Sequence, residues 1–94
     1  MKPNNKVSCI CVTFNRYDRL GAAINSFLKQ TYAHKELVIV DDSSDPLPIN
    51  IECVMVANDT LIKYVRLSNR RTIGYKRNKA IISSTGSYVA RGDD

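Results

Sequence analysis

Two short apolar runs, each ending abruptly in polar residues, constrain this chain more than any other feature of its sequence. Residues 7–14 (VSCICVTF) are nearly all apolar or β-branched, and Asn15-Arg16 follow them directly. Residues 37–40 (LVIV) are wholly apolar and run into the polar cluster 41–46 (DDSSDP). Runs of this kind are typical of parallel strands that are covered on both faces. The chain is therefore expected to fold as an α/β layer.

A helical pattern separates the two runs. Its apolar residues, spaced to form one helical face, are Leu20, Ile24, Phe27 and Leu28. Asp18 is a candidate N-cap for this helix, which is expected to end near Gln30-Thr31. A strand, a helix and a second strand joined by short connections predict a right-handed parallel crossover.

The remainder of the chain continues this alternation. Residues 62–67 and 87–90 predict two more strands, and the helix predicted between them over 74–83 should bury Ile73, Ala80 and Ile81. Residues 47–60 stay open between a weak helix and an irregular or extended segment, because prolines precede them and apolar residues alternate. The whole pattern predicts an α/β fold with a mainly parallel sheet flanked by helices.

Length and composition exclude several classes of protein. The chain has 94 residues, enough for one small domain, and no apolar run approaches the roughly 18–20 residues of a membrane helix. No signal peptide is recognisable, so we expect a cytoplasmic protein, with attachment to the inner face of the membrane as an alternative. The only histidine and three cysteines form no ligand set for zinc, and the cysteines are expected to be free, buried thiols.

Positive charge is concentrated in the second part of the chain. The net charge is +5, and no acidic residue occurs between Leu61 and Arg91. A partner that carries phosphates is the simplest explanation of such a segment. The ordinary alternative is a solvated basic surface.

Polar residues follow three of the predicted strands and should meet at one edge of a parallel sheet. They are Thr13–Arg16, Asp41–Ser44 and Asp93-Asp94. Carboxylates at such an edge can hold Mg²⁺ or Mn²⁺ and can accept hydrogen bonds from a base or ribose. The glycine-rich signatures of dinucleotide folds and P-loops are absent from the sequence. The pattern therefore suggests recognition of a metal-bridged diphosphate.

Several segments in order resemble the family-2 glycosyltransferases. They are residues 7–16 (VSCICVTFNR), 26–32 (SFLKQTY), 36–44 (ELVIVDDSS) and 74–94 (GYKRNKAIISSTGSYVARGDD). Only residues 47–60 match nothing in that family's pattern. The resemblance implies a GT-A fold whose Rossmann-like N-terminal half binds a nucleotide-diphosphate sugar.

The resemblance also implies site residues. The turn of Thr13, Phe14, Asn15 and Arg16 would contact the nucleotide, and Lys76 and Arg77 would line the donor site. Asp42 matches the carboxylate that bonds a uracil edge, with Asp41 beside it. Asp93 and Asp94 match the first two positions of the DXD motif, and they would hold Mn²⁺ or Mg²⁺.

The implied activity is transfer of a sugar from a nucleotide-diphosphate donor, preferably a UDP-sugar, to a hydroxyl of an acceptor glycan or lipid-linked glycan. By resemblance the reaction is inverting and metal-dependent and belongs to polysaccharide biosynthesis. Residues 1–94 are expected to be a single, truncated domain whose general base lies beyond residue 94. Alone, the chain is then expected to be inactive, and its unpaired edge strand to favour a homodimer.

Other interpretations stay open at this point. The chain could bind nucleotides without catalysis, and a nucleic-acid-binding module is a further alternative that we do not expect. Individual residues also have ordinary roles to weigh: Asp41 and Asp42 in a capping turn, Asn15 as a turn former, Lys76 and Arg77 on an exposed helix face, Asp93 and Asp94 in a solvated tail.

Overall fold

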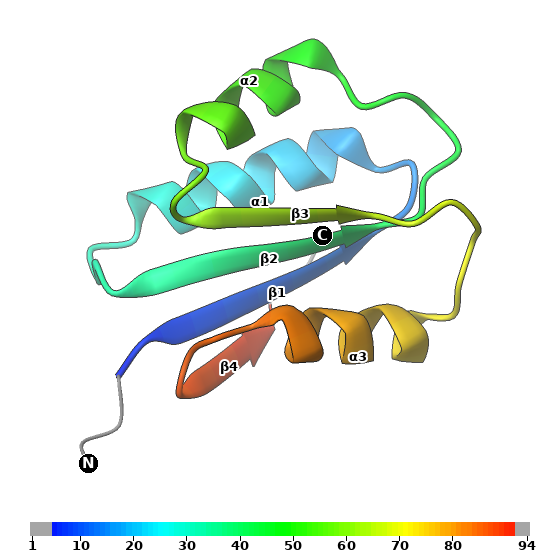
Figure 1. Cartoon of the computed structure of the whole chain (residues 1–94). Helices are drawn as coiled ribbons and strands as arrows, with labels where there is room; N and C mark the ends of the chain where they lie inside the picture. Colours follow the sequence, from blue (N-terminus) through cyan, green and yellow to red (C-terminus); the bar gives the residue numbers. More distant parts are fainter. Residues whose placement is uncertain (1–4, 92–94) are drawn as a thin grey trace.

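A four-stranded parallel sheet forms the centre of the structure, a computed structural model that describes residues 5–91 (Figure 1). Its strands are β1 (Val7–Thr13), β2 (Lys35–Asp41), β3 (Ile62–Arg66) and β4 (Tyr88–Arg91). Its helices are α1 (Tyr17–Lys29), α2 (Ile49–Ala57) and α3 (Ile73–Ser83). All strand pairs are parallel, in the order β3-β2-β1-β4. The predicted fold class is thus confirmed.

The order of the strands reverses beside β1. The chain moves from β1 to β2 and β3 on one side and then returns to place β4 on the other side of β1. Thr13 pairs with Asp41, and Asp41 pairs with Arg66, so β1, β2 and β3 end level with one another. Ligands of open parallel sheets bind outside the carboxyl ends of the strands, at the point where the order reverses.

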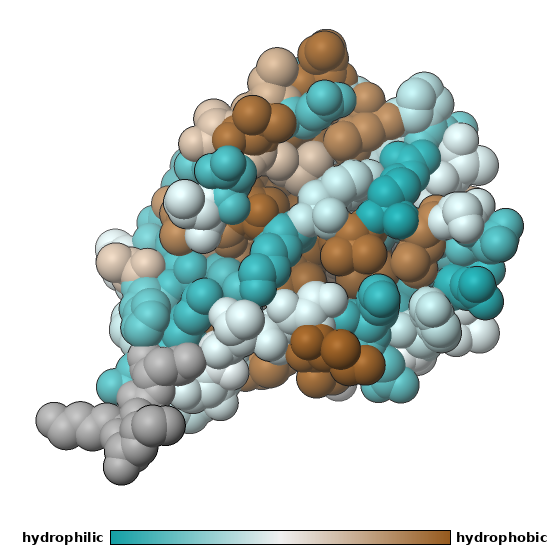
Figure 2. All heavy atoms as spheres, in the orientation of Figure 1, coloured by the Kyte–Doolittle hydropathy of each residue, from teal (hydrophilic) through white to brown (hydrophobic). Residues whose placement is uncertain are grey.

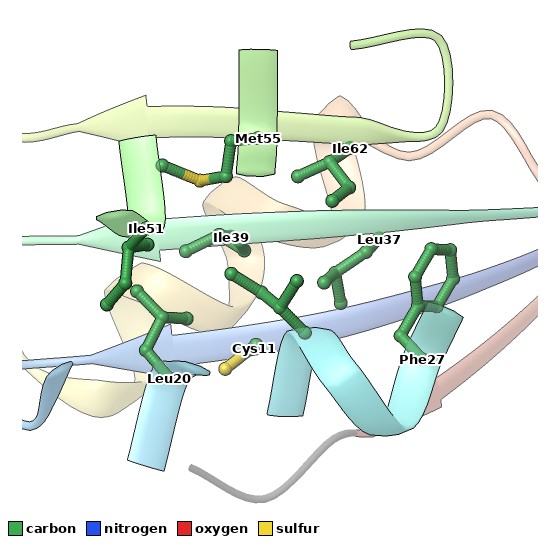
Figure 3. Close-up of a cluster of buried hydrophobic side chains, with 9 residues drawn as sticks. Cys11, Leu20, Phe27, Leu37, Ile39, Ile51, Met55 and Ile62 are labelled. Atoms are coloured by element: carbon green, nitrogen blue, oxygen red, sulfur yellow. The ribbon is translucent and has the colours of Figure 1, made fainter. Parts of the chain in front are cut away.

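Helices α1 and α2 cover one face of the sheet and enclose the main core (Figures 1 and 3). Leu20, Ile24 and Phe27 are buried, as the helical spacing predicts. The buried residues of this core are Cys11, Leu20, Ile24, Phe27, Leu37, Ile39, Ile51, Met55 and Ile62. The N-cap prediction for α1 was wrong: Arg16 occupies that position without a side-chain bond, and Asp18 lies in the first turn.

Among the described elements, only helix α3 covers the opposite face. Ala80 is buried there against β1 and β2, as predicted, together with Ile10, Val38 and Val40. The prediction failed for the other two positions, because Ile73 is 56% exposed and Ile81 is 48% exposed. The buried position in the first half of α3 belongs instead to a charged residue, Lys76.

Residues 47–60, for which the sequence allowed either a weak helix or an irregular or extended segment, contain a regular helix, α2. Its alternating apolar residues mimic a strand, yet Ile51 and Met55 lie one helical turn apart and are both buried. Pro48 is the N-cap, a position that requires no backbone donor. Ile49 and Val56 remain exposed, and Figure 2 shows hydrophobic side chains gathered over α2.

Two other sequence expectations have mixed outcomes. All three cysteines are free, but only Cys11 is buried; Cys9 is partly exposed and Cys53 is exposed on α2. In the described part of the chain, no helix is long and apolar enough to cross a membrane.

Candidate functional site

A pocket of about 320 Å³ lies beside the carboxyl end of β1. Its lining residues are Val12, Thr13, Phe14, Arg16, Arg70, Ile73, Lys76 and Arg77. Five of them were predicted from the sequence: Thr13, Phe14, Arg16, Lys76 and Arg77. The structure therefore brings together two predicted segments that lie about sixty residues apart in the chain, at the edge where ligands of such sheets bind.

The pocket is strongly cationic. Arg16, Arg70 and Arg77 take part in none of the ion pairs found among residues 5–91. Helix α3 also begins at this pocket, since its first residue, Ile73, lines the wall. A helix N-terminus and unpaired guanidinium groups both favour negative charge, so the arrangement suits a multiply charged anion.

Sequence analysis missed Arg70 as a pocket residue. Its guanidinium carbon lies 4.2 Å from the centre of the Phe14 ring, a cation–π contact. The stretch between residues 61 and 91 that lacks acidic side chains includes Arg70, but a run of charge cannot show which member will meet Phe14. The pair places a flat aromatic surface next to the cations.

Thr13 has a buried hydroxyl without a hydrogen-bond partner among residues 5–91. Its side chain is 1% exposed, and Oγ1 is buried with no hydrogen bond to any described residue. Such groups are uncommon because an unsatisfied buried hydroxyl is costly. Thr13 pairs with Asp41 and alternates with Ile10 and Val12 of the α3 side, so its hydroxyl lies on the α1 face of the sheet, away from the pocket.

Asp42 lies next to the pocket, but its side chain is covered. Lys76 Nζ donates to Oδ1 at 3.0 Å, and the Arg71 amide donates to Oδ2 at 2.7 Å. Burial would raise the pKa of the Asp42 carboxyl, but the bonds from Arg71 and Lys76 outweigh it and hold the pKa below its usual value. The ionised carboxylate thereby neutralises Lys76, which leaves the three arginines as the pocket's cations without an ion-pair partner among residues 5–91.

Asp41 does not line the pocket. It is fully buried and accepts hydrogen bonds from the hydroxyls of Tyr17 at 3.1 Å and Tyr64 at 2.6 Å. Consecutive residues of a strand point to opposite faces, so Asp41 faces the α1 side while Asp42 faces α3. The adjacent carboxylates therefore belong to different environments.

Asn15 also lies outside the pocket lining. Its φ is 52°, in the left-handed region, where asparagine is better tolerated than most residues. Its side chain donates to Ser44 Oγ at 3.0 Å and accepts from the Asp45 amide at 3.1 Å. Asn15 thus ties the turn after β1 to the loop after β2.

The predicted metal ligands Asp93 and Asp94 lie outside the described residues. Within residues 5–91, no three His, Cys, Asp or Glu side chains are grouped so that they could hold a metal ion. The metal prediction stays a prediction.

Comparisons with known proteins give the context of this site. The UDP-Glc:alpha-D-GlcNAc-diphosphoundecaprenol beta-1,3-glucosyltransferase WfgD of Escherichia coli is 34% identical over 85 residues, which cover 89% of this chain and 32% of WfgD. The chain spans about a third of the length of the curated relatives it matches.

Solved structures agree with the fold. The mannosyltransferase PcManGT from Pyrobaculum calidifontis, in complex with GDP-Man and Mn²⁺, superimposes with a TM-score of 0.83 at 24% identity, covering 99% of this chain and 29% of that one. Residues 1–349 of S. aureus TarS, in complex with UDP-GlcNAc, give a TM-score of 0.77 at 30% identity, covering 94% and 26%. Residues 8–94 match the family described as Glycosyl transferase family 2, and the chain belongs to that family.

Proposed function

We propose that the chain is the donor-binding part of a glycosyltransferase and that the pocket beside β1 holds the nucleotide diphosphate of a sugar donor, preferably a UDP-sugar. One observation carries this proposal: five residues predicted to contact the donor line a single pocket, and the three arginines of that pocket, two of them among the five, lack ion-pair partners in the described part of the chain. The similarity to TarS, whose structure holds UDP-GlcNAc, supports a nucleotide sugar as the ligand.

Each part of the pocket suits one part of such a ligand. Arg16, Arg70 and Arg77 would pair with the diphosphate, because guanidinium groups bind phosphate oxygens in a bidentate manner. The Phe14 ring would stack on the base.

Asp42 would accept a hydrogen bond from the uracil edge. Its side chain is covered by Lys76 and by the backbone of Arg71, so this contact requires one of them to move when the nucleotide binds. Asp41 and Asn15 would act on the donor indirectly, through the loops that they hold together.

Asp93 and Asp94 would hold Mn²⁺ or Mg²⁺, which neutralises charge on a diphosphate when bound. PcManGT, which shares the fold, has Mn²⁺ in its structure. We further propose an inverting transfer to a hydroxyl of a glycan or lipid-linked glycan, as part of polysaccharide biosynthesis. The name of WfgD, which contains a diphosphoundecaprenol-linked sugar, is consistent with a lipid-linked acceptor.

Calorimetric titration of UDP, with and without Mn²⁺, tests the proposal. UDP should bind, and Mn²⁺ should strengthen the binding in the natural sequence but not in the double variant Asp93→Asn, Asp94→Asn. UDP binding that is equally strong with and without Mn²⁺ would contradict the metal assignment but would still support the nucleotide pocket. If UDP did not bind while single-stranded nucleic acid did, with strong salt dependence, the basic segment would have a different role.

A further inference from the structure

Arg66, the last residue of β3, connects the buried carboxylate of Asp41 with the loop that follows β2. Its Nη2 donates to the carbonyl oxygens of Ser43 at 2.8 Å and Asp45 at 2.7 Å. Its Nη1 lies 3.4 Å from Asp41 Oδ2 and donates to the Tyr64 hydroxyl at 3.2 Å. One guanidinium group therefore fixes two backbone carbonyls of this loop relative to the sheet.

The carboxylate side of this arrangement is itself rigid. Tyr64 donates to Asp41 at 2.6 Å, and burial together with that bond raises the pKa of Tyr64 well above its ordinary value. The tyrosine therefore keeps its proton at neutral pH and remains a donor. The amide of Ser43 donates to Asp41 Oδ1 at 2.8 Å, which pins the first residue of the loop from the other side.

The loop in turn holds the turn after β1. Ser43 Oγ accepts from the Asn15 amide at 2.6 Å, and Ser44 Oγ accepts from the Asn15 side chain at 3.0 Å. Asn15 sits between Phe14 and Arg16, both of which line the pocket. The left-handed backbone of Asn15 sets the directions in which these two side chains leave the turn.

We infer that Arg66 is a positioning residue for donor binding: it acts through the loop of residues 43–45 and through Asn15 to place Phe14 and Arg16 in the pocket. This inference rests on the proposed function, since it assumes that the pocket holds the nucleotide diphosphate. Arg66 itself does not line the pocket. Its effect on binding is therefore indirect. The ammonium group of a lysine could not replace the Arg66 guanidinium, because five oxygen atoms lie around that planar group as hydrogen-bond acceptors.

Three variants test the inference by calorimetry with UDP. Arg66→Met removes the bonds to both carbonyls, and Arg66→Lys keeps the charge but not the fork. Asn15→Gly keeps a backbone that tolerates a φ of 52° but removes the side-chain bonds to the loop. All three should weaken UDP binding by about tenfold at temperatures well below unfolding. Lys29→Met, an exposed cation at the far end of α1, is the charge-matched control and should bind UDP normally.

Hydrogen–deuterium exchange without nucleotide provides a second readout. Amides of residues 14–16 and 43–45 should exchange faster in Arg66→Met, while those of β1 and β2 stay protected. If Arg66→Met or Arg66→Lys binds UDP like the natural sequence, the inference is overturned. If Arg66→Met does not fold, Asn15→Gly decides, and normal UDP binding by that variant overturns the inference.

The two proposals can fail separately. If the natural sequence binds no UDP, the proposed function fails. The hydrogen–deuterium exchange data alone then decide whether Arg66 positions residues 14–16. Faster exchange at residues 14–16 in Arg66→Met would then support it, and unchanged exchange would overturn it.

Discussion

Buried carboxylates lie near both ends of strand β2, Glu36 at its start and Asp41 and Asp42 at its other end. Glu36 and Asp42 differ in what surrounds them. Near its start, Glu36 is 1% exposed and lies 3.1 Å from Lys63 and 3.5 Å from Lys6. Just beyond its other end, Asp42 is 4% exposed and pairs with Lys76 at 3.0 Å. Both carboxyls have a lowered pKa, yet only Asp42 adjoins a pocket lined by arginines without ion-pair partners in residues 5–91.

The comparison shows that a buried, ion-paired carboxylate does not by itself mark a functional site. Glu36 accepts from Ser8 Oγ at 2.5 Å and from the Thr85 amide at 2.6 Å, so its role is to hold the turn before β4 against the sheet. What distinguishes the other end is the unbalanced positive charge around an open space. A structural network satisfies its own charges, whereas a binding site leaves some for its ligand.

The largest effect should come from removing the structural carboxylate. Glu36→Ala leaves Ser8 and the Thr85 amide without their acceptor and two lysines without their counter-charge. We expect a loss of about 3 kcal/mol in the free energy of unfolding, measured with urea. Asp59→Ala, at an exposed turn, is the control and should change stability little. An equally stable Glu36→Ala variant would show that the network contributes nothing.

A steric change at the same end should have the next largest effect. A Cβ on Gly86 would lie 2.5 Å from the Lys6 carbonyl and 2.6 Å from Ser8 Oγ, closer than side chains tolerate. Gly86→Ala should therefore cost about 2 kcal/mol of stability, as overpacking does. Gly74→Ala is the matched control, because its Cβ would meet nothing within 4 Å and α3 would gain a better helix former. Thermal unfolding of both variants measures the contrast.

At the pocket end, a substitution should weaken UDP binding and leave the free energy of unfolding almost unchanged. Arg77→Ala removes from the pocket a cation that has no ion-pair partner in the described residues, and it should weaken UDP binding by about tenfold, or about 1.4 kcal/mol. Lys79→Ala, exposed on the same helix but outside the pocket lining, is the control. Equal losses of UDP affinity in both variants would mean that only net charge matters.

Part of the loss of stability at low pH should come from Glu36. Hydrogen bonds from Ser8 and Thr85 and the nearby lysines outweigh burial and lower the pKa of Glu36 to about 2, from an ordinary value of 4.5. A lowered folded-state pKa means that the stabilisation is complete above pH 4.5 and is lost as the pH falls towards 2. Across that window, melting temperatures of Glu36→Gln should fall less steeply with decreasing pH than those of the natural sequence. Parallel pH curves would contradict the assignment.

The smallest effect should appear at the open edge of the sheet. Tyr88 and Val89 on β4 are 59% and 46% exposed, and among the described strands β4 pairs only with β1. We expect weak self-association in light scattering at high protein concentration, which Val89→Lys abolishes because a charged edge resists pairing. A natural chain that stays monomeric at every concentration would contradict this expectation.

The fold could be predicted because its signals are local. The apolar runs of β1 and β2 and the helical spacing in α1 need no knowledge of neighbours. Helix α2 could not be predicted because the spacing of Ile51 and Met55 fits both a strand and a helix. Only packing against the sheet shows that these two residues form one buried helical face. Ile73 and Ile81 were misjudged because helical spacing does not show which positions of α3 the sheet covers, and both side chains line open pockets instead.

The site was predicted in part for the same reason. The end of a strand is visible in the sequence as an apolar run followed by polar residues, so Thr13, Phe14 and Arg16 could be named from the sequence. The different faces of Asp41 and Asp42, and the roles of Arg66 and Arg70, depend on contacts between residues far apart in the chain. No local pattern carries that information.

The most direct test of the account is a titration of the ¹⁵N-labelled chain with UDP, followed through the amide resonances. We predict that the shifts concentrate at residues 13–16, 70–73 and 76–77 around the pocket, while Ser8, Glu36 and Thr85 stay unchanged as an internal reference. Shifts that centre on the Glu36 end of the sheet, or no shifts at saturating UDP, would contradict the claim that the cationic pocket binds the donor.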